Sequence, residues 1–171
     1  MIQSTIYISL TVLLSFIHMD SSKASLNQLL ISVTKKYLSV FSHQTKLLDI
    51  DRYPYVLVLV DDHQELLTQK DLAEHLQVDK SFIVNIIDHL SAEGYVYRER
   101  NEKDRRQQVI KLTDKAKETV PKVREVIDNL NARCLENLTP EQVGAFMEAL
   151  NQMDENLVDS KPFNVIINFS K

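Results

Sequence analysis

Residues 68–118, TQKDLAEHLQVDKSFIVNIIDHLSAEGYVYRERNEKDRRQQVIKLTDKAKE, decide the fold. Thr68 is a good helix N-cap, and Asp71 three residues later completes a capping box at the start of a short helix. A Gln-Val pair makes the turn, and Asp79 is the expected N-cap of a second helix. Four apolar side chains of this second helix recur at helical spacing and are predicted to face the core: Ile83, Ile86, Ile87 and Leu90. The pattern predicts two short helices joined by a tight turn.

A two-stranded ribbon is predicted after the second helix. Gly94, one of only two glycines in the chain, is the expected helix stop. Strand-forming residues at 95–97 and 109–112 flank a polar tip, residues 101–106. Residues 98–106 hold five basic and three acidic side chains. The order of these elements predicts a winged helix-turn-helix, whose arginine-rich ribbon is suited to reach into a groove of duplex DNA.

The exposed side of the second helix and the ribbon tip hold the candidate DNA contacts. Ser81, Val84 and Asn85 would lie nearest the bases, with Lys80 or Ser81 on phosphates. Asn85 is suited to a two-bond contact with adenine, and Val84 to a thymine methyl group. The alternative for the ribbon charges is a solvated hairpin tip. The complete set of candidate DNA-binding residues is Lys80, Ser81, Val84, Asn85, Arg98, Arg100, Arg105 and Arg106.

Several motifs of this stretch occur together in one known family. They are the start TQ-x-x-LA-x-x-L, the segment VDKS, the pattern I-x-x-L-x-x-x-GYV, the tip DRR and the run KLTDKA. In these motifs the chain resembles the DNA-binding domain of the MarR family of bacterial transcription regulators. The resemblance implies a dimeric, sequence-specific DNA-binding regulator, by default a repressor that a small ligand releases. It also implies that Arg106 enters the minor groove, and that Asp104 completes a D-x-R pattern and holds its guanidinium in place.

The resemblance further implies a pocket between two lobes for an aromatic or phenolic compound. The candidate pocket residues are Tyr37, Phe41, His43, Tyr53 and Tyr55. An equally weighted alternative is that these are ordinary core and boundary side chains.

The recognition helix departs from the family's pattern. Asn85 and His89 stand where many relatives carry arginines, and Phe82 stands where a small hydroxyl residue is common. These changes remove positive charge and leave two outcomes open, a preference for A·T-rich DNA or weakened binding. A winged helix that binds protein is therefore the alternative function, although such a module has no need of the arginine-rich tip.

The remaining chain is predicted to form a helical dimerisation lobe. The fold class is mainly α with a small β-wing: a winged helix-turn-helix at 51–112, and the lobe at 19–50 and 113–160. An apolar stripe from Leu26 to Leu48 predicts one amphipathic helix. The run 55–60 fits either a buried strand or, by the family's layout, a short helix.

Two further helices are expected after the wing. Apolar residues from Ala116 to Cys134 alternate in steps of four and three, which is typical of a coiled-coil-like seam, with a kink expected at Pro121. Thr139 should cap the last helix, which is predicted to bury one face, from Val143 to Leu157. Because these stripes exceed what a small winged domain can cover, a second copy of the chain is the expected partner.

The two ends of the chain do not fit this plan. Residues 1–18 have no charged side chain before His18, and basic residues begin only at Lys23. The favoured interpretation is a misplaced start codon, with Met19 as the true start; an apolar membrane anchor or an extra packed helix are the alternatives. The tail 161–171 is apolar and β-prone, and its role stays open.

Composition argues against other classes of protein. The formal net charge of the 171 residues is −4, and residues 67–118 balance ten basic against ten acidic side chains, so DNA binding must depend on placement. The single cysteine, Cys134, is expected to be a small core residue, with contact across a dimer axis as a minor alternative. No catalytic constellation or phosphate-cradling glycine loop is present, so no enzyme and no cofactor are expected. The five histidines are spread without zinc-site spacing, so no metal is expected.

The expected partners are a pseudo-palindromic double-stranded DNA operator, a second copy of the chain and a small aromatic ligand. The expected location is the cytoplasm, with no attachment to a membrane.

Overall fold

The computed structural model describes residues 24–50, 52–101 and 104–158. The chain divides into two compact units between Ser39 and Val40, within helix α2 (Leu26–Lys46). The described part of the first unit is the beginning of α2. The expectations for residues 1–18 and 161–171 lie outside the described residues.

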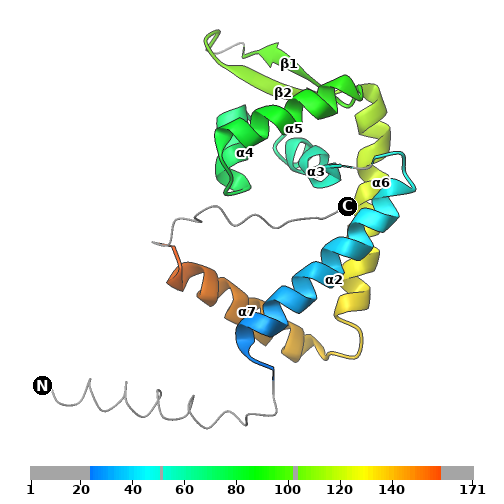
Figure 1. Ribbon diagram of the computed structural model, residues 1–171, viewed down its shortest axis with the longest axis vertical. Coiled ribbons are helices and arrows are strands. Elements are labelled where there is room, and N and C mark those ends of the chain that lie inside the picture. The colour runs from blue at the N-terminus through cyan, green and yellow to red at the C-terminus, as the bar shows by residue number, and fades with distance from the viewer. Residues whose placement is uncertain (1–23, 51, 102–103, 159–171) are drawn as a thin grey trace, which may run out of the picture. The chain divides into compact units, whose positions relative to one another are not determined.

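The second unit is mainly helical with one two-stranded sheet, which confirms the predicted fold class (Figure 1). The elements that follow α2 are α3 (Pro54–Asp62), α4 (Gln69–His75), α5 (Lys80–Ala92), β1 (Val96–Arg100), β2 (Gln108–Leu112), α6 (Asp114–Cys134) and α7 (Pro140–Asn156). The run 55–60, which fitted a strand or a helix, is helical in α3. Its residues from Val56 to Val60 are all buried, which is why the apolar pattern shows no alternation.

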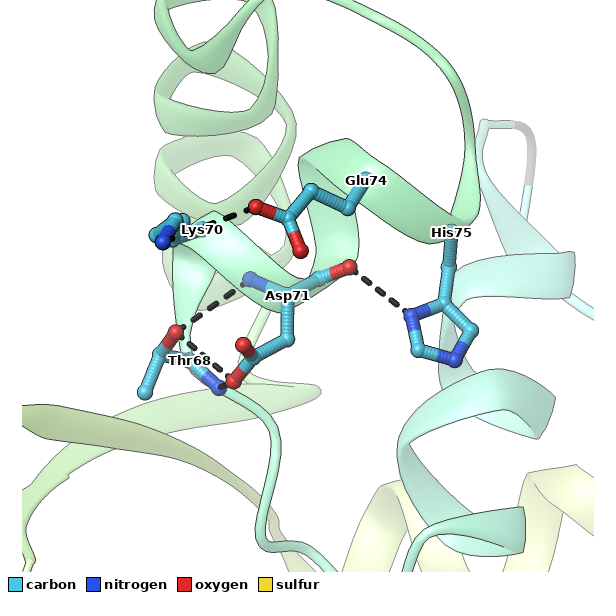
Figure 2. Close-up of polar contacts among 5 residues, drawn as sticks. All are labelled: Thr68, Lys70, Asp71, Glu74 and His75. Carbon is cyan, nitrogen blue, oxygen red and sulfur yellow. Dashed lines mark hydrogen bonds and ion pairs between the residues drawn. The ribbon is translucent and has the colours of Figure 1, made fainter. Parts of the chain in front are cut away.

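Helix α4 begins with the predicted capping box (Figure 2). The Thr68 N–H donates to Asp71 Oδ2 over 2.8 Å, and the Asp71 N–H donates to Thr68 Oγ1 over 3.3 Å. Thr139 and Gln142 form the same box at α7, as predicted. Asp79 occupies the N-cap position of α5, but its side chain makes no capping hydrogen bond among the described residues.

The sheet is a hairpin whose strands pair antiparallel, from Val96↔Leu112 to Arg100↔Gln108. Its inner strand is tied to the chain before α4, because the Ile110 N–H donates to Leu67 O over 2.8 Å. The Leu112 N–H donates to a carboxylate oxygen of Glu65. These bonds fix the hairpin against the helix-turn-helix, and β1 also contacts α5 (Figure 1).

The core of the second unit lies between α3, α4, α5, the sheet and α6. All four predicted core residues of α5 are buried, Ile83, Ile86, Ile87 and Leu90. The turn residue Gln77 adopts a left-handed conformation, and Val78 packs against the core. The first half of the α6 seam is buried, and the helix continues through Pro121.

None of the residues of α7 is buried within the single chain, so coverage of its apolar face by a second copy stays a prediction. One packing prediction is wrong. Cys134 is exposed rather than part of the core, because it lies one turn beyond Leu130, the last buried residue of α6. Apolar residues of α2 are exposed as well: Leu26, Leu29, Leu30, Ile31 and Val33. Within the described residues, no helix is both long and apolar enough to cross a membrane.

Candidate nucleic-acid interface

Helix α5 presents one face away from the core, and we call its residues the recognition surface. The buried isoleucines and Leu90 hold the opposite side of the helix in place. Lys80 and Ser81 lie in the first turn, where backbone N–H groups and the helix dipole favour an anion such as a phosphate. The recognition surface consists of Lys80, Ser81, Asn85 and Asp88, which are exposed, and Val84, which is half-buried.

An ion pair joins the recognition surface to the hairpin. Arg98 Nη2 of β1 lies 2.6 Å from Asp88 Oδ1 of α5. Arg98, which the sequence suggested as a DNA contact, is thus engaged with the acidic member of the recognition surface. The pair neutralises the negative charge of the exposed Asp88 carboxylate. Ten residues separate the partners, so no spacing rule pointed to this contact.

The hairpin presents exposed arginines at its tip and at the end of β1, as predicted. Arg100, Arg105 and Arg106 are all exposed, and the Arg106 side chain is 97% exposed. Residues 102 and 103 of the tip lie outside the described part of the chain. With strands on both sides and no burial, the three guanidinium groups are accessible to a polyanion.

The Asp104 carboxylate bonds to the backbone of Arg106 and to the side chain of Gln107. Its Oδ1 accepts a hydrogen bond from the Arg106 N–H over 3.0 Å, and its Oδ2 accepts one from Gln107 Nε2 over 3.2 Å. The distance from Arg106 Nε to Asp104 Oδ1 is 4.0 Å, a loose ion pair. Asp104 therefore lies beside Arg106 as the sequence suggested, but it orders the turn more than it holds the guanidinium.

The unusual aromatic residues of α5 pack against one tyrosine. The Tyr53 ring meets Phe82 and His89 edge-on, with centroid distances of 6.3 and 5.8 Å. Tyr53 itself is in a left-handed conformation, with φ of 59°, directly before α3. Phe82 and His89, the two departures from the family's pattern, therefore both pack on Tyr53 beside the recognition surface.

The predicted ligand-pocket residues are spread over both units. Tyr37 belongs to the first unit, and the other four belong to the second. Phe41 and Tyr53 are partly buried and pack against the core, whereas His43 and Tyr55 are exposed. The pocket stays a prediction from the resemblance.

Ion pairs brace α6 against the helix-turn-helix. Arg124 Nη2 lies 2.7 Å from carboxylate oxygens of both Asp61 and Asp62, at the end of α3. Hydrogen bonds to Asp61 and then Asp62 raise the pKa of Arg124. Lys117 Nζ lies 3.3 Å from Glu65, and this hydrogen bond raises the pKa of Lys117. The helix that leaves the wing is therefore fixed to the loop before α4.

Among the described residues, no three His, Cys, Asp or Glu side chains are grouped so that they could hold a metal ion. The histidines are less scattered than their spacing suggested, because the rings of His63 and His75 meet with a centroid distance of 4.6 Å.

Known proteins resemble both the sequence and the fold. A model of the MarR family matches residues 51–107. The HTH-type transcriptional regulator YfiV of Bacillus subtilis (strain 168) is 33% identical over 106 residues, which cover 62% of this chain and 66% of that protein's length. A MarR family transcriptional regulator from Listeria monocytogenes, solved with a 26mer DNA, has a TM-score of 0.73 at 19% identity, covering 80% of this chain and 91% of that one. The MepR–DNA complex of S. aureus has a TM-score of 0.72 at 21% identity, covering 78% and 96%.

The solved structures show the fold, and the family model covers the helix-turn-helix and most of the wing. The TQ-x-x-LA start, the GYV segment and the DRR tip occupy the elements that the resemblance assigned to them. The winged helix-turn-helix of this chain therefore matches the MarR family of transcriptional regulators over residues 51–107, and the fold is that of solved MarR family structures.

Proposed function

We propose that the protein binds DNA sequence-specifically as a dimer and represses transcription until a small ligand releases it. The observation that carries this proposal is the exposed recognition surface of α5 beside a hairpin with three exposed arginines at and next to its tip. Residues 67–118 carry equal numbers of basic and acidic side chains, so the domain does not present a continuous basic surface for non-specific binding of DNA. Its charges are instead placed at the two points where a winged helix meets a duplex.

The recognition surface would enter the major groove. Lys80 and Ser81 at the start of α5 suit phosphates, and Val84 and Asn85 suit a thymine methyl group and an adenine edge. Arg105 and Arg106 at the tip would lie along the minor groove. Arg98 has a different role from the other arginines. Because it is paired with Asp88, it acts as a positioning residue that neutralises this acidic side chain.

Exposed apolar side chains support dimerisation. In α2 they are Leu26, Leu29, Leu30, Ile31 and Val33, and in α7 they include Phe146 and Met147. Extensive exposed apolar surface is typical of a protein–protein interface. A two-fold dimer would place two recognition helices about 34 Å apart and would match a pseudo-palindromic operator.

Release by a ligand is the part that rests on the resemblance alone. A ligand can shift the equilibrium toward the DNA-free arrangement of the protein only if it binds that arrangement more tightly than the DNA-bound one. Tyr37, Phe41, His43, Tyr53 and Tyr55 remain the candidates for contact with an aromatic compound. A regulator of this kind would act on the chromosome, in the cytoplasm.

The direct test is binding of the full chain to the DNA upstream of its own gene, at two salt concentrations. Fluorescence anisotropy with the wild type, Arg106→Ala and Arg133→Ala would separate tip contacts from general charge, because Arg133 is an exposed arginine at the far end of α6. We expect Arg106→Ala to weaken binding and to reduce the salt slope by about 1, and Arg133→Ala to leave both unchanged. Equal, weak binding of all three proteins to any sequence would instead favour a protein-interaction module.

A further inference from the structure

His63 and His75 come from different helices and meet at their rings. His63 is the C-cap residue of α3, and His75 is the last residue of α4. Their centroids are 4.6 Å apart, and the ring planes are nearly perpendicular, at 81°. His63 is half-buried and His75 is exposed, so solvent and small ions can reach the pair.

The backbone fixes the same tautomer in both rings when they are neutral. His63 Nδ1 lies 2.9 Å from Leu59 O, and His75 Nδ1 lies 2.9 Å from Asp71 O. A carbonyl oxygen can only accept, so each Nδ1 must carry the hydrogen and each Nε2 keeps its lone pair. Figure 2 shows this bond for His75. Histidines that bind metals usually have this arrangement, with the second ring nitrogen donating to a carbonyl or carboxylate.

The acidic side chains of α4 already have other partners. Asp71 accepts hydrogen bonds from Thr68 in the capping box, and Glu74 pairs with Lys70 at 3.6 Å (Figure 2). The carboxylates of Asp71 and Glu74 are therefore bound to Thr68 and Lys70 and not to the ring of His75.

The acidic side chains next to His63 are also engaged. Both Asp61 and Asp62 bind Arg124 at 2.7 Å. Among the described residues, neither His63 nor His75 forms an ion pair with a carboxylate. The pair therefore presents two adjacent imidazole rings.

We propose that His63 and His75 form an open two-histidine site for a divalent transition-metal ion of the zinc or copper type. Imidazole nitrogen is a preferred ligand of these ions. Two imidazoles that share one Zn²⁺ through nitrogens at about 2.1 Å have ring centroids roughly 5 Å apart, close to the observed separation. Water would complete the coordination, since two protein ligands leave positions open.

An ion at this place would link the ends of α3 and α4 across the loop between them. Gln64 and Glu65 in this loop both have a left-handed backbone conformation, with φ of 53° and 59°. This conformation is unfavourable for residues other than glycine. A bridging ion binds only the folded arrangement, so it should stabilise the domain in proportion to its concentration.

The test is a calorimetric titration of the full chain with Zn²⁺ in a buffer without chelators. The variants are His63→Gln, His75→Gln and, as a matched control, His43→Gln, which removes an exposed histidine of α2. Loss of an outer-shell partner of a metal ligand weakens binding roughly 10- to 100-fold, so removal of a ligand should weaken it at least tenfold. We expect that loss for His63→Gln and His75→Gln, and unchanged affinity for His43→Gln.

A second measurement covers the case in which a variant unfolds. In the wild type, ¹⁵N NMR should show that Zn²⁺ shifts the Nε2 resonances of His63 and His75 ahead of those of other histidines. No binding to the wild type, equal binding to all three variants, or shifts confined to other histidines would overturn the proposal. None of these readouts involves DNA, so the result is independent of the proposed regulatory function.

Discussion

Arg98 Nη2 of β1 donates a hydrogen bond to Asp88 Oδ1 of α5 over 2.6 Å, so the wing and the recognition helix are joined by an ion pair. The Asp88 side chain is 59% exposed, and a pair of this exposure contributes only about 0–1 kcal/mol to stability. Its larger effect should be on DNA binding. A carboxylate on the recognition surface repels phosphates, and the guanidinium beside it cancels that repulsion.

Asp88→Asn should therefore strengthen DNA binding, and Arg98→Ala should weaken it. The first variant removes the negative charge and frees Arg98, whereas the second leaves the charge without its partner. Each change should amount to about 1 kcal/mol, or roughly fivefold in Kd. Anisotropy titrations at low salt measure it, with Glu125→Gln on the exposed side of α6 as the charge-matched control for Asp88→Asn. Weaker binding by Asp88→Asn would show that the carboxylate contacts DNA itself, for example at a cytosine amino group.

The tip offers a sharper test of how Asp104 acts. Its Oδ1 accepts from the Arg106 N–H, and an asparagine oxygen can do the same, whereas alanine cannot. If the turn bond matters, Asp104→Asn should keep DNA affinity and Asp104→Ala should lose several-fold. Should both variants lose affinity equally, the negative charge near the Arg106 guanidinium would be the cause. The measurement is the same titration, with circular dichroism to check folding.

The sequence was most predictive where the interactions are local. The capping box of Thr68 and the four-residue spacing of Ile83 and Ile87 depend only on helix geometry, and both predictions are confirmed. The contact of His63 with His75 depends on how two helices pack, so linear spacing could not reveal it. Cys134 was misplaced for a related reason: the apolar seam predicted its face of the helix but not where the chain's own core ends.

The capping box also gives a stability prediction with an internal control. Thr68→Ala removes the acceptor of the Asp71 N–H at the start of α4 and should lower the free energy of unfolding by about 1 kcal/mol. Thr68→Ser keeps the hydroxyl group and should lose much less. Urea unfolding, followed by circular dichroism, measures both. Equal losses would mean that the threonine methyl group, rather than the cap, supports this position.

The exposed face of α7 predicts the assembly of the protein. Phe146 is 47% exposed, and no residue of α7 is buried in the single chain. If this face is covered by a second copy, Phe146→Glu places a charge in an apolar interface and should raise the dimer Kd at least about tenfold. Asn151→Glu puts the same charge on an exposed polar position of the helix and should leave the dimer intact.

Analytical ultracentrifugation over a range of concentrations distinguishes these cases. A wild type that stays monomeric at tens of micromolar, or a Phe146→Glu variant that dimerises normally, would place α7 outside the dimer interface. A monomeric Phe146→Glu variant should also lose most of its affinity for a two-half-site operator, while affinity for a single half-site stays the same. That difference arises because one subunit keeps its recognition surface and tip but no longer gains the second set of contacts from its partner.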